Sequence, residues 1–445
     1  MIASLSTRTC PNCGSLFDHD ERFTEWCPSC EWNLGGPPPQ QGRAARRPAR
    51  ERDRAGRLFA RLARHPGARP WTAGRVGAGL LATLVHLVTV GIAVGSVLLV
   101  LEGTPVAIMV GVVGIGLIIL VRPRLGGGSD ARFALARDDA PELYGLADRI
   151  ATELGVPKPD RLRVEPGFRS GYARVGIRRQ TELTIGLALW TALGPGERIA
   201  LLGRELGHGA ARSPRSGLWL RLALAGLDSW CRVLLPGKGD RLMARQFGSE
   251  AGLDQVTASF AVVQLRGRAQ RAMLDGLANG VLQVLALPVQ LLRRCLHRLL
   301  EAGSQQAEYR ADDFAAQAGS SRAATAMLDL LFLEASAAAH LRKERALVGH
   351  GGVPRPKDIA EALWQGLSDY LASVPDTERE RRRRIGARLG TAVDGWHPPT
   401  HLRIRRQQER PDQPAAVAAD SVDWAAVHGE LEDSRWHTAV MVLGI

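Results

Sequence analysis

Four cysteines near the N-terminus have the spacing of metal ligands. Cys10 pairs with Cys13 and Cys27 with Cys30 in two Cys-x-x-Cys motifs. Such pairs place four thiolates around one tetrahedral zinc ion, and a segment this short would take much of its folding energy from the metal. A redox or iron–sulfur site uses the same ligands, but this spacing favours zinc. Because four protein ligands leave no open coordination position, we predict a structural zinc ribbon over residues 1–34.

A second group of reactive side chains lies between Arg204 and His208, where the chain reads Arg-Glu-Leu-Gly-His. Pro195 and Glu197 favour the start of a helix just before it. In a helix, positions 204 and 208 share a face, as the two zinc ligands of His-Glu-x-x-His enzymes do, and the intervening Glu205 would activate water. Here position 204 is arginine, whose protonated guanidinium has no lone pair for a cation.

Helices and short strands must position this segment. Apolar residues recur at helical spacing over Ala140–Leu154, and three short strands are predicted to follow, at Leu162–Val164, Gly171–Val175 and Glu182–Leu187. We therefore expect a mainly α-helical domain with a small antiparallel β-sheet beside the helix that carries Glu205.

Further motifs lie in order along residues 130–405. They are Leu154-Gly-Val-Pro-Lys-Pro159, Leu193-Gly-Pro-Gly-Glu197, Glu308-Tyr-Arg-Ala-Asp312 and Trp396-His397-Pro-Pro399. Together with the Glu205–His208 pair, they resemble the membrane zinc metallopeptidases of the HtpX and CAAX prenyl protease type. The resemblance implies a zincin-like metallopeptidase domain.

The resemblance also implies a role for each matched residue. It makes Glu205 the general base and His208 and Glu308 zinc ligands. Asp312 would be an acid that orients a ligand, and His397 would stabilise the oxyanion. Gly171 and Tyr172 would belong to a strand that pairs with an extended peptide substrate. The chain departs from the family at Arg204 and at Ser170-Gly-Tyr-Ala173, where the family more usually has Asn-Ala-Phe.

Three interpretations of Arg204 are open. Its charge could replace that of zinc and form salt bridges with Glu205 and Glu308. Alternatively, Arg204 could swing out, so that His208, Glu308 and either His397 or His401 hold a weaker zinc ion. The match could also be a coincidence on an ordinary helix.

These interpretations lead to different functions. The first hypothesis is a metallopeptidase homologue, acting on membrane-associated or misfolded proteins, whose activity is impaired because arginine removes both metal affinity and Lewis acidity. The second is an adaptor whose degenerate cleft captures extended protein segments while the zinc ribbon recruits a partner. The third is an active metalloendopeptidase with a rearranged zinc site.

Two apolar runs predict a transmembrane helical hairpin over residues 76–124. Val76–Leu101 carries no formal charge and is long enough to span a bilayer, and Val106–Val121 is a shorter second run. Arginines lie outside both ends, at Arg43–Arg75 and at Arg122 and Arg124. The positive-inside rule therefore predicts a multi-pass protein of the cell membrane with both termini cytoplasmic.

The net charge of +13 is concentrated in one stretch. Residues 35–75, a linker rich in proline and arginine, contain eleven arginines and two acids from Arg43 onward, and so carry nine of the thirteen charges. We expect this stretch to contact the anionic inner leaflet. Nucleic acid is not expected as a partner, because the stretch adjoins a membrane span and holds few aromatic residues.

Several segments remain. We expect a flexible join at residues 125–129, the metallopeptidase-like domain over 130–410 and a partly helical tail over 411–445. Leu218–Leu235 is predicted as an amphipathic or buried helix. Gly276–Leu292 is either part of a long soluble helix or a segment that dips into the bilayer, and the Arg379–Arg384 cluster is expected on a solvated helix face.

Overall fold

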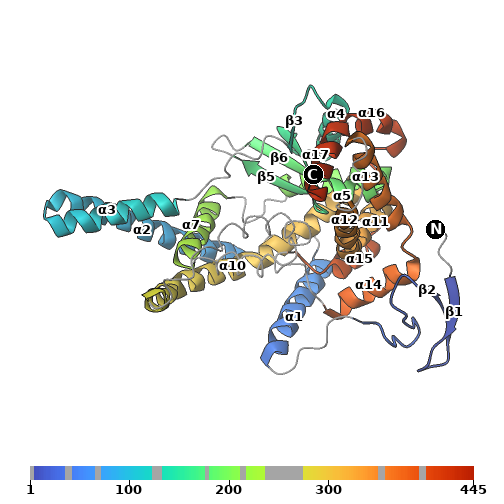
Figure 1. Cartoon of the computed structure of the whole chain (residues 1–445), viewed down its shortest axis with the longest axis horizontal. Coiled ribbons are helices and arrows are strands. Elements are labelled where there is room, and N and C mark those ends of the chain that lie inside the picture. The colour runs from blue at the N-terminus through green and yellow to red at the C-terminus, as the bar shows by residue number, and fades with distance from the viewer. Residues whose placement is uncertain are drawn as a thin grey trace.

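A computed structural model describes residues 5–35, 43–65, 72–122, 133–175, 180–210, 217–235, 274–348, 356–389 and 397–444. The described part is mostly helical, with two small sheets (Figure 1). A pair of long apolar helices projects from one side of a helical body, and the N-terminal hairpin lies on the opposite side. The predicted join at 125–129 lies outside the described residues.

The N-terminal module, residues 5–35, is built on an antiparallel hairpin of β1 (Leu5–Thr9) and β2 (Leu16–Asp20). Its core is small: buried Phe17 packs with Cys10 and Cys27. So few apolar side chains bury little surface, and the module therefore depends on additional links for its stability.

The apolar hairpin has the predicted form. Helix α1 (Arg43–Arg64) precedes α2 (Thr72–Glu102), which packs along α3 (Pro105–Val121). Thr104 caps α3, and Gly103 adopts a positive φ of 82° in the turn. A Cβ at Gly111 would lie 2.6 Å from the Ser96 carbonyl oxygen, so glycine permits the close approach of the two helices.

In the part of the chain that the structure describes, two helical stretches are long and apolar enough to cross a membrane. In Gly74–Glu102 only 11% of the most apolar window is buried in the protein, whereas in Ser321–Leu347 50% is buried. The second stretch contributes Ala324, Leu328 and Leu341 to the main core, so its apolar character is explained by packing inside the body. Within the described residues, no such packing accounts for the exposed apolar surface of Gly74–Glu102.

The second sheet has the strand order β3-β4-β6-β5, with β3 at Ala134–Leu135, β4 at Arg161–Glu165, β5 at Gly171–Val175 and β6 at Gln180–Gly186. The predicted small antiparallel sheet is present: β3 pairs with β4 and β5 with β6 in antiparallel fashion, while β4 and β6 are parallel. After β4 the chain crosses to the far edge, forms β5 and returns as β6 between β4 and β5. Strand β5 is therefore an edge strand.

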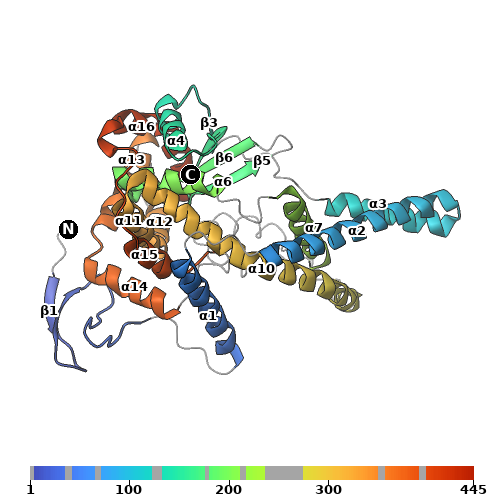
Figure 2. The same ribbon diagram turned by 180° about the vertical axis from the view of Figure 1, so that it is seen from behind.

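The body consists of this sheet and the helices around it. The helices are α4 (Pro141–Glu153), α5 (Leu187–Ala192), α6 (Pro195–Ala210), α7 (Leu218–Leu234), α10 (Leu274–Gly319), α11 (Ser321–Leu330), α12 (Glu334–Val348), α13 (Pro356–Ala372), α14 (Asp376–Leu389), α15 (Thr400–Gln408), α16 (Trp424–Glu430) and α17 (Glu432–Leu443). Of these, α5, α6 and α17 contact the sheet. Helix α10 crosses the whole body and continues along the apolar hairpin (Figure 2).

Three predicted segments are refined by this packing. The Leu218–Leu235 segment is helix α7, and Gly276–Leu292 is the first part of the long helix α10, with Pro288 inside it. The predicted tail forms α16 and α17 and joins the main core through Val427, Ala439 and Val442, so the C-terminal domain extends beyond residue 410.

Candidate functional site

The four cysteines of the N-terminal module converge. Their Sγ atoms all lie within 4.8 Å of one another, and those of Cys10 and Cys30 are 3.6 Å apart. In the first knuckle, the Gly14 backbone N–H donates to the Cys10 carbonyl oxygen at 2.9 Å, and Gly14 has a φ of 74°. The donor set and its geometry fit one four-coordinate metal ion.

The thiols of the two knuckles differ in their environment. Burial raises the pKa of Cys10 to about 11, whereas hydrogen bonds from Ser15 lower the pKa of Cys13 to about 6. Cys10 is buried and Cys13 is exposed. A bound cation would favour the thiolate form of each cysteine.

Helix α14 holds this module against the body, so the interpretation of Arg379–Arg384 as a solvated face is wrong. The Arg381 guanidinium donates to the Leu34 carbonyl oxygen at 3.0 Å and Arg384 donates to that of Pro28 at 2.5 Å. Arg384 also lies over the Trp26 ring, and Arg388 pairs with Glu31. Pro28 lies inside the second Cys-x-x-Cys knuckle, so the metal-binding loop itself forms part of this interface.

The second candidate site is a buried cluster of charges between α6 and α10. Glycines on α6 let the two helices touch: a Cβ at Gly207 would lie 2.6 Å from the Phe314 Cβ. This contact brings Arg204 against the side chains that α10 presents from its last three turns. Glu308 lies one helical turn before Asp312, so both carboxylates face α6.

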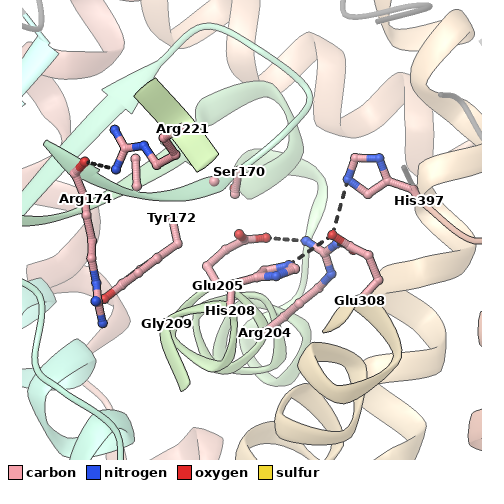
Figure 3. Close-up of a pocket in the computed structure, with 12 residues that line it drawn as sticks. Ser170, Tyr172, Arg174, Arg204, Glu205, His208, Gly209, Arg221, Glu308 and His397 are labelled. Carbon is pink, nitrogen blue, oxygen red and sulfur yellow. Dashed lines mark hydrogen bonds and ion pairs between the residues drawn. The ribbon is translucent and has the colours of Figure 1, made fainter. Parts of the chain in front are cut away.

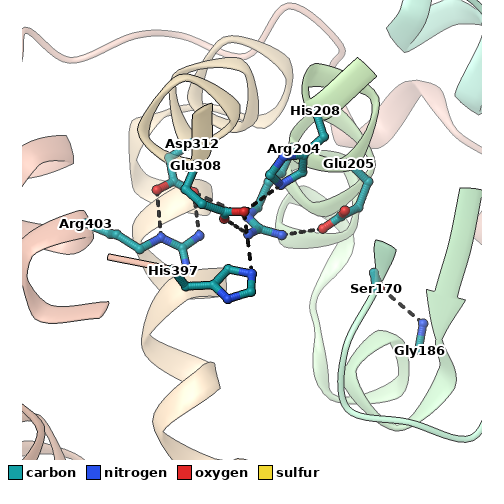
Figure 4. A network of polar contacts seen from close by, with 9 residues as sticks. All are labelled: Ser170, Gly186, Arg204, Glu205, His208, Glu308, Asp312, His397 and Arg403. Atoms are coloured by element: carbon teal, nitrogen blue, oxygen red, sulfur yellow. Dashed lines mark hydrogen bonds and ion pairs between the residues drawn. The ribbon is translucent and has the colours of Figure 1, made fainter. Parts of the chain in front are cut away.

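The Arg204 guanidinium lies among three carboxylates (Figure 4). It pairs with Glu205, donates from Nη2 to Glu308 Oε2 at 2.5 Å, and donates from Nε to Asp312 Oδ1 at 3.3 Å. Only 9% of Arg204, 2% of Glu205 and none of Asp312 is exposed. One arginine therefore uses all three of its nitrogens on buried acids of two helices.

A second arginine adds positive charge to this network. Arg403 on α15 donates to both oxygens of Asp312, at 2.6 and 2.8 Å. Two guanidinium groups thus face three carboxylates in the buried network. Although burial opposes ionisation, the surrounding cationic groups lower the pKa of Glu308, and the carboxylates raise the pKa of Arg204.

Two histidines border the same glutamate. Nε2 of His208 lies 3.6 Å from Glu308 Oε1, and Nε2 of His397 lies 3.5 Å from the same atom. Burial lowers the pKa of His208, which favours its neutral form. Burial also lowers the pKa of His401, on the same helix as Arg403.

A metal-binding arrangement of histidine and acid is not formed in the described part of the chain. There, the four cysteines are the only group of at least three potential ligands whose donor atoms lie within 4.8 Å of one another. The space between Glu205 and Glu308 is filled by the guanidinium of Arg204. The donor set at this second site therefore does not fit a metal ion as it stands.

The charge cluster opens into a cavity of about 420 Å³ (Figure 3). Edge strand β5 lines this cavity with Gly171 and Tyr172, opposite Arg204, Glu205, His208, Glu308 and His397. At the same edge, Arg221 on α7 donates to the Arg174 carbonyl oxygen at 2.8 Å. All of the predicted residues of this site are thus brought to one place.

The sequence did not mark Arg174, Arg221 or Arg403 as residues of this site. Arg403 had no signal in its spacing, because it reaches Asp312 from another helix. Arg221 did have a signal in the sequence, since it interrupts an otherwise apolar helix.

Comparisons with protein-family models, with curated proteins and with solved structures find no match to this chain.

Proposed function

We propose that this protein is a membrane-anchored, catalytically silent homologue of the HtpX-type metallopeptidases, whose cleft binds extended segments of other proteins. The observation that carries the proposal is the position of Arg204, whose guanidinium lies between Glu205 and Glu308. In this view a covalently attached cation takes the place of the catalytic zinc.

The chemistry of the guanidinium supports a loss of activity. Arg204 places one positive charge among the buried acids, where a divalent cation would place two, and it has no coordination position for water or for a substrate carbonyl. Glu205 is engaged in an ion pair with Arg204, which occupies the carboxylate that would otherwise contact a water molecule. With neither an activated water nor a Lewis acid, peptide hydrolysis loses both of its main sources of rate.

The cavity beside β5 supports binding of an extended segment. An edge strand can pair with a further strand, and β5 presents Gly171 and Tyr172 to the cavity. Arg221 already donates to one carbonyl of this strand, that of Arg174. A bound segment would have to displace the Arg221 guanidinium from this carbonyl or pair beside it. This end of the cleft would therefore accept some segments and exclude others.

The remaining parts of the proposal concern the metal and the membrane. Zinc is the metal that four cysteines at this spacing hold best. Helices α2 and α3 would cross the membrane, with arginine-rich ends and both termini in the cytoplasm. The N-terminal module and the C-terminal domain that holds the charge cluster would then both lie in the cytoplasm. There the module could bind a protein partner.

Zinc counting on the full-length protein tests the proposal. We expect one zinc per chain, lost in a Cys13→Ser/Cys27→Ser variant and unchanged in Glu308→Ala. Two zinc ions per chain, one of them lost in Glu308→Ala, would refute it and favour the active enzyme with a rearranged site.

Placing a histidine at position 204 provides a second test. Arg204→His should bind a second zinc and gain proteolysis of an unfolded substrate, and Arg204→His/Glu205→Gln should keep the metal but lose the activity. Proteolysis by the unmodified protein, abolished by Glu205→Gln, would contradict the assignment as a silent homologue.

A further inference from the structure

A groove between α1 and α10 has no role in the proposed function. Its volume is about 550 Å³. Three arginines of α1, Arg54, Arg57 and Arg61, line one side, and Arg298 of α10 lines the other. Among the described lining residues, Glu301 is the single carboxylate.

The helical repeat of α1 and of α10 places the lining residues of the groove on one face of each helix. On α1, positions 54, 57, 58, 61 and 62 lie on one face, and they alternate guanidinium groups with Leu58 and Leu62. On α10, positions 298, 301, 302 and 305 likewise share one face. The groove is thus strongly cationic, and leucines form its apolar lining.

Its position relative to the apolar hairpin is fixed by packing. Leu296 and Leu300 of α10 are fully buried against Ala78 and Ala82, in the first turns of α2. Leu299 lies 3.7 Å from where a Cβ of Gly77 would be. Arg298, next to Leu299, is therefore level with the arginine-flanked end of α2, where a bilayer would have its phosphate groups.

We propose that this groove binds the phosphate of an anionic phospholipid headgroup. Guanidinium groups recognise phosphate through paired, charge-assisted hydrogen bonds, and here they converge from two helices. Leu58, which is half-buried, offers apolar contact to the glycerol and the upper acyl chain, and buried Leu62 lies beneath it in the groove wall. A free phosphate could use the arginines alone but would gain nothing from the leucines, and this difference separates the two sources.

Binding to the purified full-length protein in neutral detergent tests this site without requiring membrane insertion. Dioctanoyl phosphatidylglycerol, dioctanoyl phosphatidylcholine and inorganic phosphate would be titrated separately, with bound lipid counted by native mass spectrometry. We expect saturable binding of phosphatidylglycerol at one site, at least about tenfold tighter than binding of the other two. Equal binding of phosphatidylcholine, or tighter binding of inorganic phosphate, would overturn the assignment.

Matched charge variants locate the site. Arg57→Gln/Arg298→Gln removes two groove arginines, whereas Arg50→Gln/Arg64→Gln removes two exposed arginines of α1 that do not line the groove. The groove pair should weaken phosphatidylglycerol binding at least about tenfold, and the control pair less than about threefold. Equal losses would mean diffuse attraction by the basic helix and would refute the site. If the groove pair does not fold, Arg61→Gln alone replaces it and should weaken binding about fivefold.

Discussion

Removing the charge of Arg204 should expose the energetic basis of the buried network. Arg204→Met keeps an unbranched apolar stem but leaves Glu205 and Glu308 without their guanidinium partner, while Asp312 keeps Arg403. Breaking a buried ion pair from one side costs about 3–5 kcal/mol. We expect an unfolding temperature lower by roughly 6–20 °C at neutral pH, measured by thermal unfolding of the purified protein in detergent.

The effect should depend on pH in a definite direction. The pKa of Glu308 is lowered in the folded protein. Its ionisation therefore contributes stability at a pH above the pKa of glutamate in the unfolded chain, about 4.3. This contribution is lost as the pH falls through the pKa of Glu308 in the folded protein. Without Arg204, the pKa of Glu308 should rise, so that protonation relieves the unpaired charge at a higher pH. The gap in stability between the native protein and Arg204→Met should therefore be largest near neutral pH and should narrow toward about pH 5.

Two further variants make this reasoning falsifiable. Arg379→Met is the control, because the Arg379 guanidinium donates to the carbonyl oxygens of Val374 and Leu371, and it should cost only about 1–2 kcal/mol. Adding Glu308→Gln to Arg204→Met should recover about 1–3 kcal/mol. A loss in Arg204→Met no larger than in the control, or one that grows as the pH falls, would refute an arginine-for-metal replacement.

The remaining predictions concern packing, metal and topology. Gly207→Ala places a Cβ 2.6 Å from that of Phe314 and should destabilise the protein by about 1–3 kcal/mol, whereas Gly145→Ala has open space around it and should be neutral or slightly stabilising in the same thermal unfolding assay. Chelation of the metal should release the N-terminal module from α14, and limited proteolysis should then cut within residues 5–35; unchanged protection would show that the module is held without metal. A reporter fused after Ile445 should lie in the cytoplasm, and an external reporter would overturn the proposed orientation.

Much of the site was predictable because its parts are local in sequence. The Cys-x-x-Cys spacing brings each thiol pair together within a single turn, and the helical repeat puts Arg204 and His208 on one face. The apolar runs likewise predicted helices α2 and α3 and the turn between them. In each case the deciding distances are set by a few neighbouring residues.

The missed features depend on contacts between distant segments. No local pattern placed β6 between β4 and β5, so the parallel pair was not expected. The arginines of α14 resembled a solvated face because their partners, the Pro28 and Leu34 carbonyl oxygens, lie about 350 residues away. The Arg298 side of the cationic groove was invisible for the same reason, since it is formed only when α1 packs on α10.

The sequence by itself determined which side chains are present and in what local order, including an arginine at position 204, where the His-Glu-x-x-His pattern has its first histidine. Only the tertiary structure decided what that arginine does. The close contact of α6 with α10, made possible by glycine at 207, brings Glu308 and Asp312 to the guanidinium. In a buried site these charges must neutralise one another, because water is not available to solvate them.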